Sequence, residues 1–334
     1  MMTVLQPGPL ATVQDLGRPG VQAWGVTPGG AVDDLALRMG NWLVGNPEGA
    51  AAIEMTLQGM TIVFALPTLI AITGAPMEGY ELDMHGARMG NTLPMWRPVW
   101  VNAGSILQWG RIREGVRSYL CVHGGIKVHS VLGGAGTDVR SGFGGHLGRP
   151  LQAGDQLMLG SQSSRYEKLK AELLPGVAWA ASGWEASRWR DWRCGPARPI
   201  PWIPLDESAT MLLAGDWRAL PDSDRQGLRL SSIEFAESPA RKVSHRSAGV
   251  CFGLVQLPPD GQPIVLLADH QTTGGYPVAG VVASVARSQL AQTRPGDVVQ
   301  FVPVSLSDAH NALFEREQRL RFLRQQLHWR ERAE

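Results

Sequence analysis

Short apolar runs separated by glycine and proline constrain the fold of this chain more than any other sequence feature. Runs rich in Val, Ile and Leu recur along most of the sequence, while 40 glycines and 23 prolines interrupt it. Such runs are typical of β-strands, and Gly, Pro, Asn and Asp between them are typical of turns. The pattern predicts a mainly β protein with few helices.

The predicted strands fall into two segments, roughly 1–160 and 201–306. The first segment contains the runs MTIVFAL, TLIAIT, SILQW, SYLCVHG and QLMLG, and the second contains TMLLAG, GLRLS, CFGLVQL, PIVLLAD, GVVASVA and DVVQFVPV. A small motif recurs in NAGSILQW, QAGDQLML and RPGDVVQF, where glycine precedes Ser or Asp and then alternating apolar residues. This motif predicts a glycine turn that leads into a strand.

Two stretches favour helix. Residues 31–45 are loosely periodic, and Asp33 and Asp34 fall in the first turn, where carboxylates favour the helix dipole. Residues 307–334 form the second predicted helix, with Ser307 as its cap. Its apolar stripe consists of Leu313, Leu320, Leu323 and Leu327.

The segment 161–200 differs in composition from its neighbours. Five of the 12 tryptophans lie between 179 and 202, interleaved with arginines. We interpret the segment as a connector between two lobes. The alternative is a surface for single-stranded nucleic acid, which combines basic and aromatic side chains.

Charge and cysteine content exclude several classes of protein. The net charge of +1 over 334 residues argues against nucleic acid or an anionic membrane as the main partner, since both need a basic face. We expect neither a signal peptide nor a membrane-spanning segment. Cys121, Cys194 and Cys251 are too far apart for a CxxC site, and three isolated thiols suit a reducing cytoplasm.

Two motifs in the first segment are candidates for anion binding. In TVQDLGRPG, the spacing of Asp15 and Arg18 favours a turn with an ion pair; the alternative is an arginine positioned to receive a carboxylate or phosphate. We interpret the glycine-rich stretch 123–149 as loops between strands; the alternative is that its backbone amides cradle an anion. It matches neither a Walker A loop nor a dinucleotide-binding fingerprint, and its histidine spacings match no standard metal site, so we expect no metal.

A third motif, DHQTTGGYPVAG at 269–280, follows the buried-strand run QPIVLLA. Polar side chains gather there on a loop where Gly274 and Gly275 allow close approach of a ligand or a positive φ. The residue types fit a ligand site and an ordered polar turn about equally well, and composition leaves both interpretations open.

Together these stretches resemble the biotin-dependent carboxyltransferase family, also called allophanate hydrolase subunit 2. The family includes the C subunit of 5-oxoprolinase, the antagonist of a sporulation kinase inhibitor, and the carboxyltransferase domain of urea carboxylase. The motifs occur in the family's order and cover most of residues 3–303. They are TVQDLGRPG, GVTPGGAVDDLALRMGNWLVGN, AAIEMTLQG, SYLCVHGGI, LGGAGTDVRSGFGGHLGRPLQAGD, DRQGLRL, PPDGQPIVLLADHQTTGGYPVAGVV and LAQTRPGDVVQF.

The resemblance implies a two-lobed, cyclophilin-like β-barrel architecture. The expected parts are a lobe at 1–160, the Trp-rich connector at 161–200, a lobe at 201–306 and a helix at 307–334. It also implies a cytoplasmic subunit of an ATP-dependent 5-oxoprolinase, a hydrolase that opens the lactam of 5-oxoproline to glutamate. Partner proteins resembling the A and B subunits of that enzyme are expected to share the ATP. A lactam carbonyl is a poor electrophile, and phosphorylation of its oxygen makes attack by water feasible.

The resemblance assigns candidate roles to individual residues. Arg18, Gln271 and Tyr276 are the implied catalytic residues. The implied substrate-binding residues are Asp15, Asp33, Asn41, Arg149, Thr272, Gly274, Gly275 and Pro277. Further matches to the family's motifs are Asn46, Glu54 and Asp155.

Two positions depart from the family pattern. After Ser247, Ala248 occupies a place where the family usually has Glu, and Ala286 occupies a place where Asp is common. Two other functions therefore stay open. One is biotin-dependent carboxyl transfer to a urea-like amide, in which biotin is the cofactor. The other is non-catalytic regulation, in which the chain antagonises a kinase inhibitor.

Overall fold

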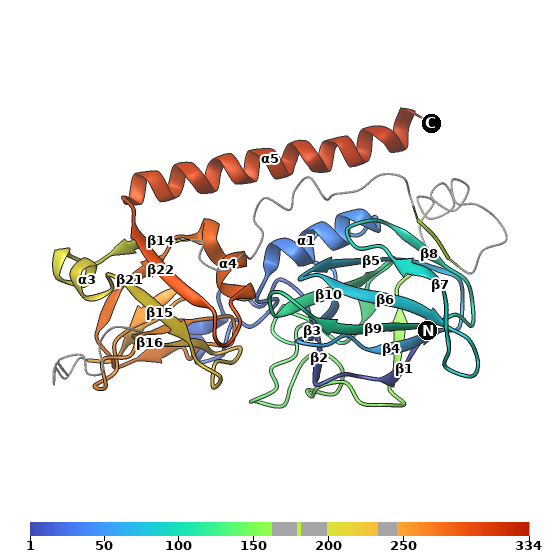
Figure 1. Ribbon diagram of the computed structural model, residues 1–334, viewed down its shortest axis with the longest axis horizontal. Helices are drawn as coiled ribbons and strands as arrows, with labels where there is room; N and C mark the ends of the chain where they lie inside the picture. Colours follow the sequence, from blue (N-terminus) through green and yellow to red (C-terminus); the bar gives the residue numbers. More distant parts are fainter. Residues whose placement is uncertain (162–178, 182–198, 233–245, 334) are drawn as a thin grey trace. The chain divides into compact units, whose positions relative to one another are not determined.

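The computed structural model describes residues 1–161, 179–181, 199–232 and 246–333. The chain divides into two compact units, shown in Figure 1. Unit 1 consists of Met1–Gly17, Asp33–Trp192 and Leu323–Glu334, whereas unit 2 consists of Arg18–Val32 and Arg193–Phe322. The lobe boundaries at 160 and 201 stay a prediction. The compact units differ from them chiefly because Arg18–Val32 group with unit 2.

The predicted connector, 161–200, lies largely outside the described residues, as does Cys194. The connector interpretation and the nucleic-acid alternative therefore both stay predictions. Within the described part of the chain, no helix combines the length and apolar character needed to cross a membrane.

Unit 1 contains two antiparallel sheets. The first sheet has the strand order β11 (Ile126–Lys127), β12 (Gln156–Leu159), β1 (Met2–Gln6), β4 (Thr61–Phe64), β9 (Ile106–Ile112), β6 (Met77–Leu82) and β7 (Arg88–Leu93). The second has the order β13 (Trp179–Ala181), β8 (Val99–Val101), β5 (Thr68–Gly74), β10 (Arg117–Val122), β3 (Ala52–Thr56) and β2 (Leu10–Gln14).

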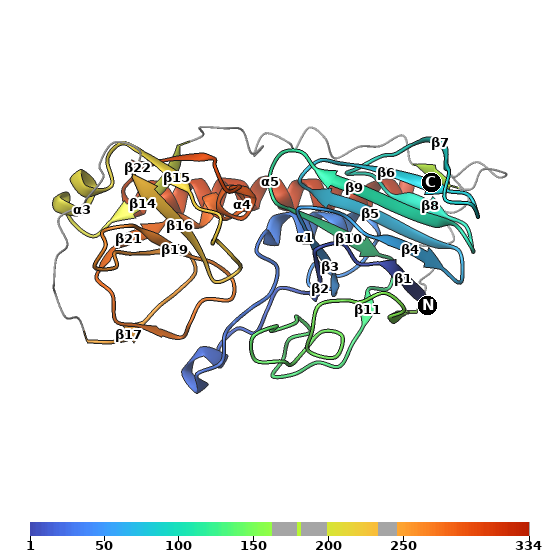
Figure 2. The same ribbon diagram turned by 60° about the horizontal axis from the view of Figure 1, so that its bottom comes forward.

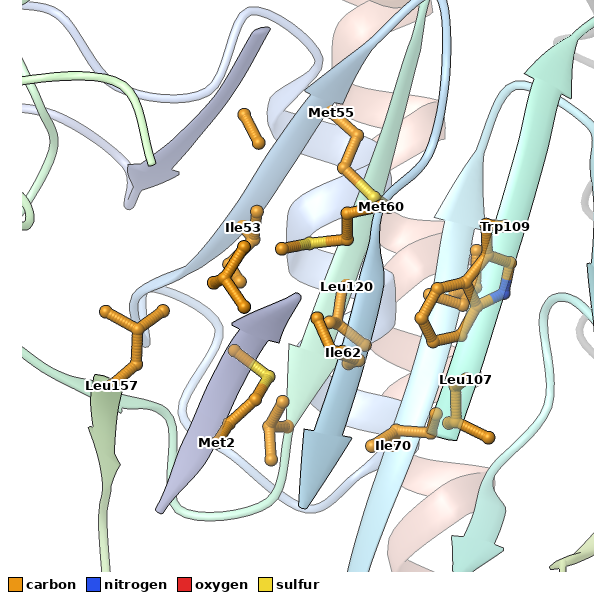
Figure 3. Close-up of a cluster of buried hydrophobic side chains, with 14 of the residues drawn as sticks. Met2, Ile53, Met55, Met60, Ile62, Ile70, Leu107, Trp109, Leu120 and Leu157 are labelled. Carbon is orange, nitrogen blue, oxygen red and sulfur yellow. The ribbon is translucent and has the colours of Figure 1, made fainter. Parts of the chain in front are cut away.

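The core of unit 1 is built from apolar side chains of both sheets (Figure 3). Ile62 of β4 and Trp109 of β9 come from the first sheet, whereas Ile53 of β3 and Leu120 of β10 come from the second. All four are at most 2% exposed. Burial of each such side chain stabilises the fold by about 1.5–3 kcal/mol, so this core accounts for the packing of the two sheets.

Helix α1 (Asp34–Leu43) packs against β5 and β10 of the second sheet. It confirms the helix predicted at 31–45, and Asp33 caps it by accepting a hydrogen bond from the backbone N–H of Ala36 at 3.2 Å. The approach of α1 is close at Gly40, where a Cβ atom would lie 2.6 Å from Cys121 Sγ and 2.8 Å from Thr73 Oγ1. The position therefore requires glycine for packing, although glycine weakens a helix.

Unit 2 is built around a closed barrel (Figure 2). Its strand order is β14 (Ile200–Pro204), β21 (Val278–Val282), β18 (Leu254–Gln256), β19 (Ile264–Leu266), β16 (Gly227–Ser232), β15 (Asp216–Ala219) and β22 (Val298–Pro303). A separate two-stranded sheet joins β17 (Ala248–Gly249) to β20 (Thr273–Gly274). The other short elements are η1 (Val21–Trp24), α3 (Glu207–Leu212), η3 (Ser284–Ala286) and α4 (Arg287–Gln292). The mainly β prediction, with few helices, is confirmed.

Three local predictions need correction. The run 210–215 was expected to be a strand, but Thr210 and its neighbours lie in α3, because the Asp206 carboxylate caps that helix through the N–H of Ala209 at 2.8 Å. The strand predicted at 280–286 ends at Val282 and continues into η3. The long C-terminal helix is confirmed as α5 (Leu306–Ala333). Its first turn is closed by Ser305, whose Oγ accepts from the N–H of Asp308, and not by Ser307.

The glycine-turn prediction is confirmed at all three copies of the motif. Gly104, Gly154 and Gly296 have φ values of +81°, +90° and +95°, and each precedes a strand by one or two residues. Side chains other than glycine rarely adopt this left-handed conformation. The sequence therefore marked the starts of β9, β12 and β22 through backbone chemistry alone.

Candidate functional site

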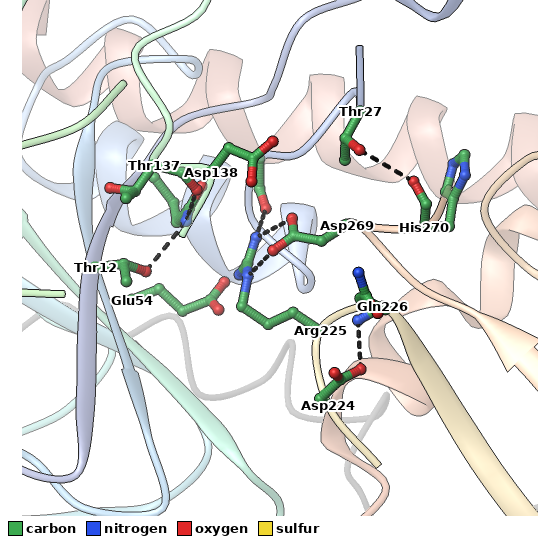
Figure 4. Close-up of polar contacts among 12 residues, drawn as sticks. Thr12, Thr27, Glu54, Thr137, Asp138, Asp224, Arg225, Gln226, Asp269 and His270 are labelled. Carbon is green, nitrogen blue, oxygen red and sulfur yellow. Dashed lines mark hydrogen bonds and ion pairs between the residues drawn. The ribbon is translucent and has the colours of Figure 1, made fainter. Parts of the chain in front are cut away.

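A buried ion pair forms the base of the candidate site in unit 2 (Figure 4). Arg225 donates to both carboxylate oxygens of Asp269, at 2.7 and 2.8 Å, and to the carbonyl oxygen of Gly30 at 2.7 Å. The Arg225 side chain is 7% exposed. A bidentate pair of this kind combines strength with fixed geometry. It ties the start of the 269–280 motif to the N-terminal segment Arg18–Val32.

Further contacts join that segment to the loop that follows Asp269. The Thr27 hydroxyl donates to the carbonyl oxygen of His270 at 3.3 Å. The Gln22 side-chain amide donates to the carbonyl oxygens of Thr272 and Val250. A single carboxamide thus holds the backbone just after β17 and just before β20, so the position of the loop depends on the N-terminal segment.

Arg18 lies inside the same segment and is 1% exposed. Its backbone N–H donates to the carbonyl oxygen of Pro28 at 2.8 Å. A Cβ atom built on Gly29 would lie 3.3 Å from the Arg18 guanidinium and 3.8 Å from an Asp269 carboxylate oxygen. Both charged groups therefore border the Gly29–Gly30 turn, where the two glycines have φ values of +63° and +86°.

The polar loop itself is fixed by hydrogen bonds at both ends. The Gln271 side chain donates to Gln256 Oε1 at 3.2 Å, and the carbonyl oxygen of Pro277 accepts from the N–H of Leu257 at 2.9 Å. His270 Nδ1 lies 2.6 Å from the carbonyl oxygen of Gln271. Because a carbonyl only accepts, Nδ1 carries the hydrogen. Burial lowers the pKa of His270, which favours the neutral imidazole.

Within this loop, some side chains remain accessible. Gln271 and Gly275 are exposed, and Tyr276 is 46% exposed. A primary carboxamide supplies both a donor and an acceptor, and a phenol does the same. The loop can therefore bind a neutral polar ligand such as an amide, and its backbone is held in place before the ligand arrives.

The other predicted site residues lie in unit 1, where their side chains bond to the protein itself. The Asp15 carboxylate, which is 8% exposed, accepts from the N–H groups of Gly17 at 2.8 Å, Ala135 at 2.6 Å and Gly136 at 3.1 Å. One interpretation of the sequence is that amides of the 123–149 loop cradle an anion. The backbone amides of Ala135 and Gly136 already bind the Asp15 carboxylate, so these two amides offer no phosphate-binding position for ATP.

Asn41 and Asn46 form a second internal clamp in unit 1. Asn41 donates to the carbonyl oxygens of Glu48 and Ala50, at 3.2 and 2.8 Å. The Asn46 amide donates to Asn41 Oδ1 at 3.0 Å, and its own oxygen accepts from the N–H of Gly124. These contacts fix the chain after α1. They account for both asparagines without a ligand.

Arg149 and Asp155 form a third clamp. Arg149 donates to both Asp155 oxygens at 2.8 Å, and Asp155 also accepts from the N–H of Gln152. These hydrogen bonds, led by the one from Arg149, lower the pKa of Asp155 to about 2. The pair closes the loop that leads into β12. The substrate-binding role of Arg149 stays a prediction.

A buried polar network in unit 1 was only partly anticipated. The Tyr119 hydroxyl donates to the Glu54 carboxylate at 2.7 Å and accepts from the backbone N–H of Asp33 at 2.9 Å. Arg117 lies 3.7 Å from the other Glu54 oxygen. Burial, followed by the charge of Glu54, raises the pKa of Tyr119 well above its ordinary value. The network attaches the start of α1 to the second sheet.

The predicted residues therefore divide between the units. Unit 1 holds Asp15, Asp33, Asn41 and Arg149. Unit 2 brings together Arg18, Gln271, Thr272, Gly274, Gly275, Tyr276 and Pro277. Sequence reasoning missed three residues of unit 2 that position the loop, namely Gln22, Arg225 and Gln256. Arg225 lies in the family-like motif DRQGLRL, which was a usable signal. Gln256 lies in the run CFGLVQL, which predicts only a strand, and nothing in the sequence marked Gln22.

Among the residues that the structure describes, no three His, Cys, Asp or Glu side chains gather closely enough to hold a metal ion. The chemical groups available at the unit 2 loop are therefore amide, hydroxyl, imidazole and backbone groups, beside the buried Arg225–Asp269 pair.

Comparison with known proteins gives relatives over nearly the whole chain. The C subunit of 5-oxoprolinase from Haemophilus influenzae is 36% identical over 324 residues, covering 92% of this chain and 93% of the relative. The C subunit of 5-oxoprolinase from Escherichia coli is 35% identical over 334 residues, covering 99% and 98%. Both relatives are parts of an enzyme, as their names state.

A structural relative comes from a larger enzyme. The crystal structure of Kluyveromyces lactis urea carboxylase matches with a TM-score of 0.75 and 27% identity. The match covers 92% of this chain and 28% of that one.

The family model described as carboxyltransferase domain, subdomain A and B, matches residues 24–303. That range begins within the segment Arg18–Val32 of unit 2. It includes every strand of the two unit 1 sheets except β1 and β2, and it also includes the barrel and the 269–280 loop. The chain therefore belongs to the carboxyltransferase domain family comprising subdomains A and B.

Proposed function

We propose that the chain is a subunit of an ATP-dependent 5-oxoprolinase, which opens the lactam of 5-oxoproline to glutamate together with partners resembling the A and B subunits of that enzyme. The observation that carries this proposal is the match to two 5-oxoprolinase C subunits over 93% and 98% of their lengths. The match to urea carboxylase covers only 28% of that larger chain. The proposed location is the cytoplasm.

The unit 2 loop supports a role in substrate orientation. Gln271 and Tyr276 offer donors and acceptors from an accessible loop, which suits the amide group of a lactam. Holding a substrate in a reactive geometry is itself a large part of catalysis. Arg18, Gln271 and Tyr276 remain the proposed catalytic residues, and Thr272, Gly274, Gly275 and Pro277 the proposed binding residues. In unit 1, Asp15, Asp33, Asn41 and Arg149 also remain proposed binding residues.

ATP is shared with the partner subunits in this proposal. The amides of Ala135 and Gly136 already bind the Asp15 carboxylate, so the 123–149 loop supplies no evident phosphate contact there. We therefore assign no step of ATP chemistry to a residue of this chain. Its own contribution is to bind and orient the lactam.

The test is reconstitution of the assembled enzyme. The chain is purified with its candidate A-like and B-like partners, and release of ADP and glutamate is measured with and without 5-oxoproline. We expect both products only with 5-oxoproline and all three chains present. A folded three-chain complex that releases neither product contradicts the proposal.

A matched pair of variants links that activity to the loop. Tyr276→Phe removes the hydroxyl from the loop, whereas Tyr80→Phe removes one from strand β6 of unit 1, where it donates to Glu78. We expect the first change to reduce glutamate release about tenfold or more and the second to leave it unchanged. Equal effects of the two changes exclude a specific role for Tyr276.

The structural match to urea carboxylase favours one alternative, biotin-dependent carboxyl transfer to a urea-like amide. This alternative predicts a biotinylated partner and a requirement for bicarbonate. Activity that persists after avidin treatment and in bicarbonate-free buffer excludes it.

The two departures from the family pattern favour another alternative, a non-catalytic regulator of a kinase inhibitor. Ala248 is exposed and pairs with Gly274 across the β17–β20 sheet, so an acid is missing beside the loop. Ala286 is 1% exposed and occupies the N-cap of α4 without a side-chain cap. If a partner-dependent effect on the inhibitor persists in Tyr276→Phe and Gln271→Met, that effect does not use the loop as a catalytic site.

A further inference from the structure

Gln256 is the last residue of β18 and one of the few buried polar side chains of the barrel, with 2% of its surface exposed. Its Oε1 accepts the hydrogen bond from Gln271 at 3.2 Å. Its Nε2 is also buried but has no hydrogen-bond acceptor among the residues that the structure describes. The fold therefore keeps a buried carboxamide although one of its two polar atoms is unpaired.

An unpaired buried donor costs free energy that an apolar side chain of the same shape would avoid. Such groups are rare in folded proteins, and each calls for an explanation. The neighbouring backbone shows the same constraint. A Cβ atom at Gly274 would overlap the Gln256 carboxamide and lie 3.0 Å from Val250 Cγ1. Glycine at this position thus allows β20 to pass directly over the Gln256 amide.

The bond to Gln256 restricts how Gln271 presents its own carboxamide. Gln271 is exposed, but one of its N–H groups is used by Gln256, and its backbone carbonyl oxygen is held by His270. In a primary carboxamide the N–H syn to the oxygen and the oxygen itself form one edge of a planar group, and this edge of Gln271 is available when Gln256 takes the anti hydrogen. The same edge, with donor and acceptor exchanged, occurs in every cis amide. A five-membered lactam is cis because of its ring, whereas open-chain peptide amides are almost always trans.

We propose that Gln256 and Gln271 together recognise the cis-amide edge of the ligand. Gln271 Oε1 accepts the ligand N–H, and Gln271 Nε2 donates its second hydrogen to the ligand carbonyl oxygen. Gln256 is a positioning residue that fixes the orientation of the Gln271 amide. The inference rests on the proposed function for the identity of the lactam, but not on ATP or partner subunits, because urea and the ureido ring of biotin present the same edge.

The test is calorimetric titration of the full chain, alone and in its three-chain complex, with defined small molecules. 5-Oxoproline and 2-pyrrolidinone carry the cis-amide edge, N-methyl-5-oxoproline lacks its N–H, and proline lacks its carbonyl. We expect N-methylation to weaken binding at least tenfold, because it leaves Gln271 Oε1 unpaired in the complex. Proline is expected to show no measurable binding. Titration with urea and with biotin shows whether the chain instead recognises the same edge in one of those compounds.

Variants then separate positioning from folding. Gln256→Met keeps the size of the buried side chain and removes the unpaired donor, so we expect unchanged or higher thermal stability. We also expect about tenfold weaker 5-oxoproline binding and loss of the discrimination against the N-methyl compound. Gln300→Met is the matched control, because that amide lies on β22 of the same barrel and donates to Asp216 instead. Gln271→Glu, at an exposed position, removes the donor without disturbing the barrel.

The outcomes separate this inference from the proposed function. If Gln256→Met or Gln271→Glu binds and discriminates like the unaltered chain, or if none of the cis-amide compounds binds, the inference is wrong, even where oxoprolinase activity is observed. If urea or biotin binds through these glutamines and 5-oxoproline does not, recognition of the edge is supported and the oxoprolinase assignment is contradicted. Should Gln256→Met fail to fold, Gln271→Glu alone decides.

Discussion

The two glycine-rich polar loops of this chain look alike in sequence and differ in how they use their polar groups. In the 123–149 loop of unit 1, backbone amides are bound by Asp15, and the segment after it is closed by Arg149 and Asp155. In the 269–277 loop of unit 2, the backbone is bonded to the rest of the unit, but the side chains of Gln271 and Tyr276 are exposed.

The difference shows what separates a structural loop from a binding loop. Charged side chains that already have several partners in the protein stabilise its own backbone and have little capacity left for a ligand. A loop that is anchored through its backbone, with exposed amide and hydroxyl side chains, is organised in advance and can still form new bonds. On this basis we expect changes in the first loop to affect stability and changes in the second to affect binding.

The largest expected effect concerns the base of the unit 2 loop. Arg225→Met leaves the Asp269 carboxylate, which is 14% exposed, without its bidentate partner and frees the carbonyl oxygen of Gly30. We expect the free energy of unfolding to fall by about 3–5 kcal/mol, measured by urea denaturation. Arg229→Met breaks only the exposed pair with Asp222 and serves as the control, with an expected loss below about 1 kcal/mol. Similar losses in the two variants contradict a buried anchor.

The next effect concerns Asp15 in unit 1. Asp15→Asn keeps the size of the side chain but replaces one acceptor oxygen by an amide that faces the N–H groups of Ala135 or Gly136. We expect a loss of about 2 kcal/mol in unfolding free energy, and we expect this loss of stability to exceed any change in lactam affinity. If the variant keeps its stability but loses ligand binding, the contrast between the two loops is wrong at this residue.

A change in the packing of α1 is expected to lower stability by a comparable amount, although no polar group is removed. Gly40→Ala raises helix propensity, yet the added methyl group would overlap Cys121 and Thr73. Overpacking of a buried position costs about 1–3 kcal/mol, so we expect lower stability. A melting temperature that rises would show that the helix lies farther from the sheet.

Acid titration tests the ion pair between Arg149 and Asp155. The pKa of Asp155 is lowered from 3.8 to about 2, chiefly by the hydrogen bond from Arg149. Because the folded state binds this proton less readily than the unfolded state, the stabilisation is complete above pH 3.8 and is lost as the pH falls through about 2. Asp155→Asn is expected to flatten the stability profile in that window. An identical slope in both proteins would show that the pair does not form in solution.

The smallest effect on stability is expected in the binding loop. Gln271→Met alters an exposed side chain that makes one hydrogen bond, so the free energy of unfolding should change by no more than about 1 kcal/mol. Lactam affinity should nevertheless fall about tenfold. Denaturation and titration of the same preparation compare the two quantities directly. A large loss of stability would show that Gln271 has a structural role, like the bonded side chains of Asp15 and Arg149 in unit 1.

Much of the fold could be predicted from the sequence, because strands and glycine turns are local features. The buried runs that became β5, β10 and β16 were recognisable from composition alone. The run at 210–215 was not, since short apolar runs fit a helix as well as a strand and the cap at Asp206 decides between them.

The candidate site was predictable only where its residues are neighbours in the chain. The 269–280 motif identified Gln271, Thr272 and Tyr276, but their supports come from distant segments. Gln22 and Gln256 reach the loop through tertiary contacts, and the local sequence around each did not identify it as a site residue. Asp15 illustrates the converse, because the pattern around it fits anion recognition and only the structure shows that the residue is itself the bound anion.

The membership of Arg18–Val32 in unit 2 has a consequence for biosynthesis. During translation this segment leaves the ribosome early. Arg225, which donates to the carbonyl oxygen of Gly30, and its partner Asp269 follow much later. At ordinary elongation rates the delay is on the order of ten seconds or more. The nascent segment lacks these contacts for that time. The part of unit 1 that precedes Leu323–Glu334 can therefore assemble co-translationally while unit 2 waits for the later part of the chain.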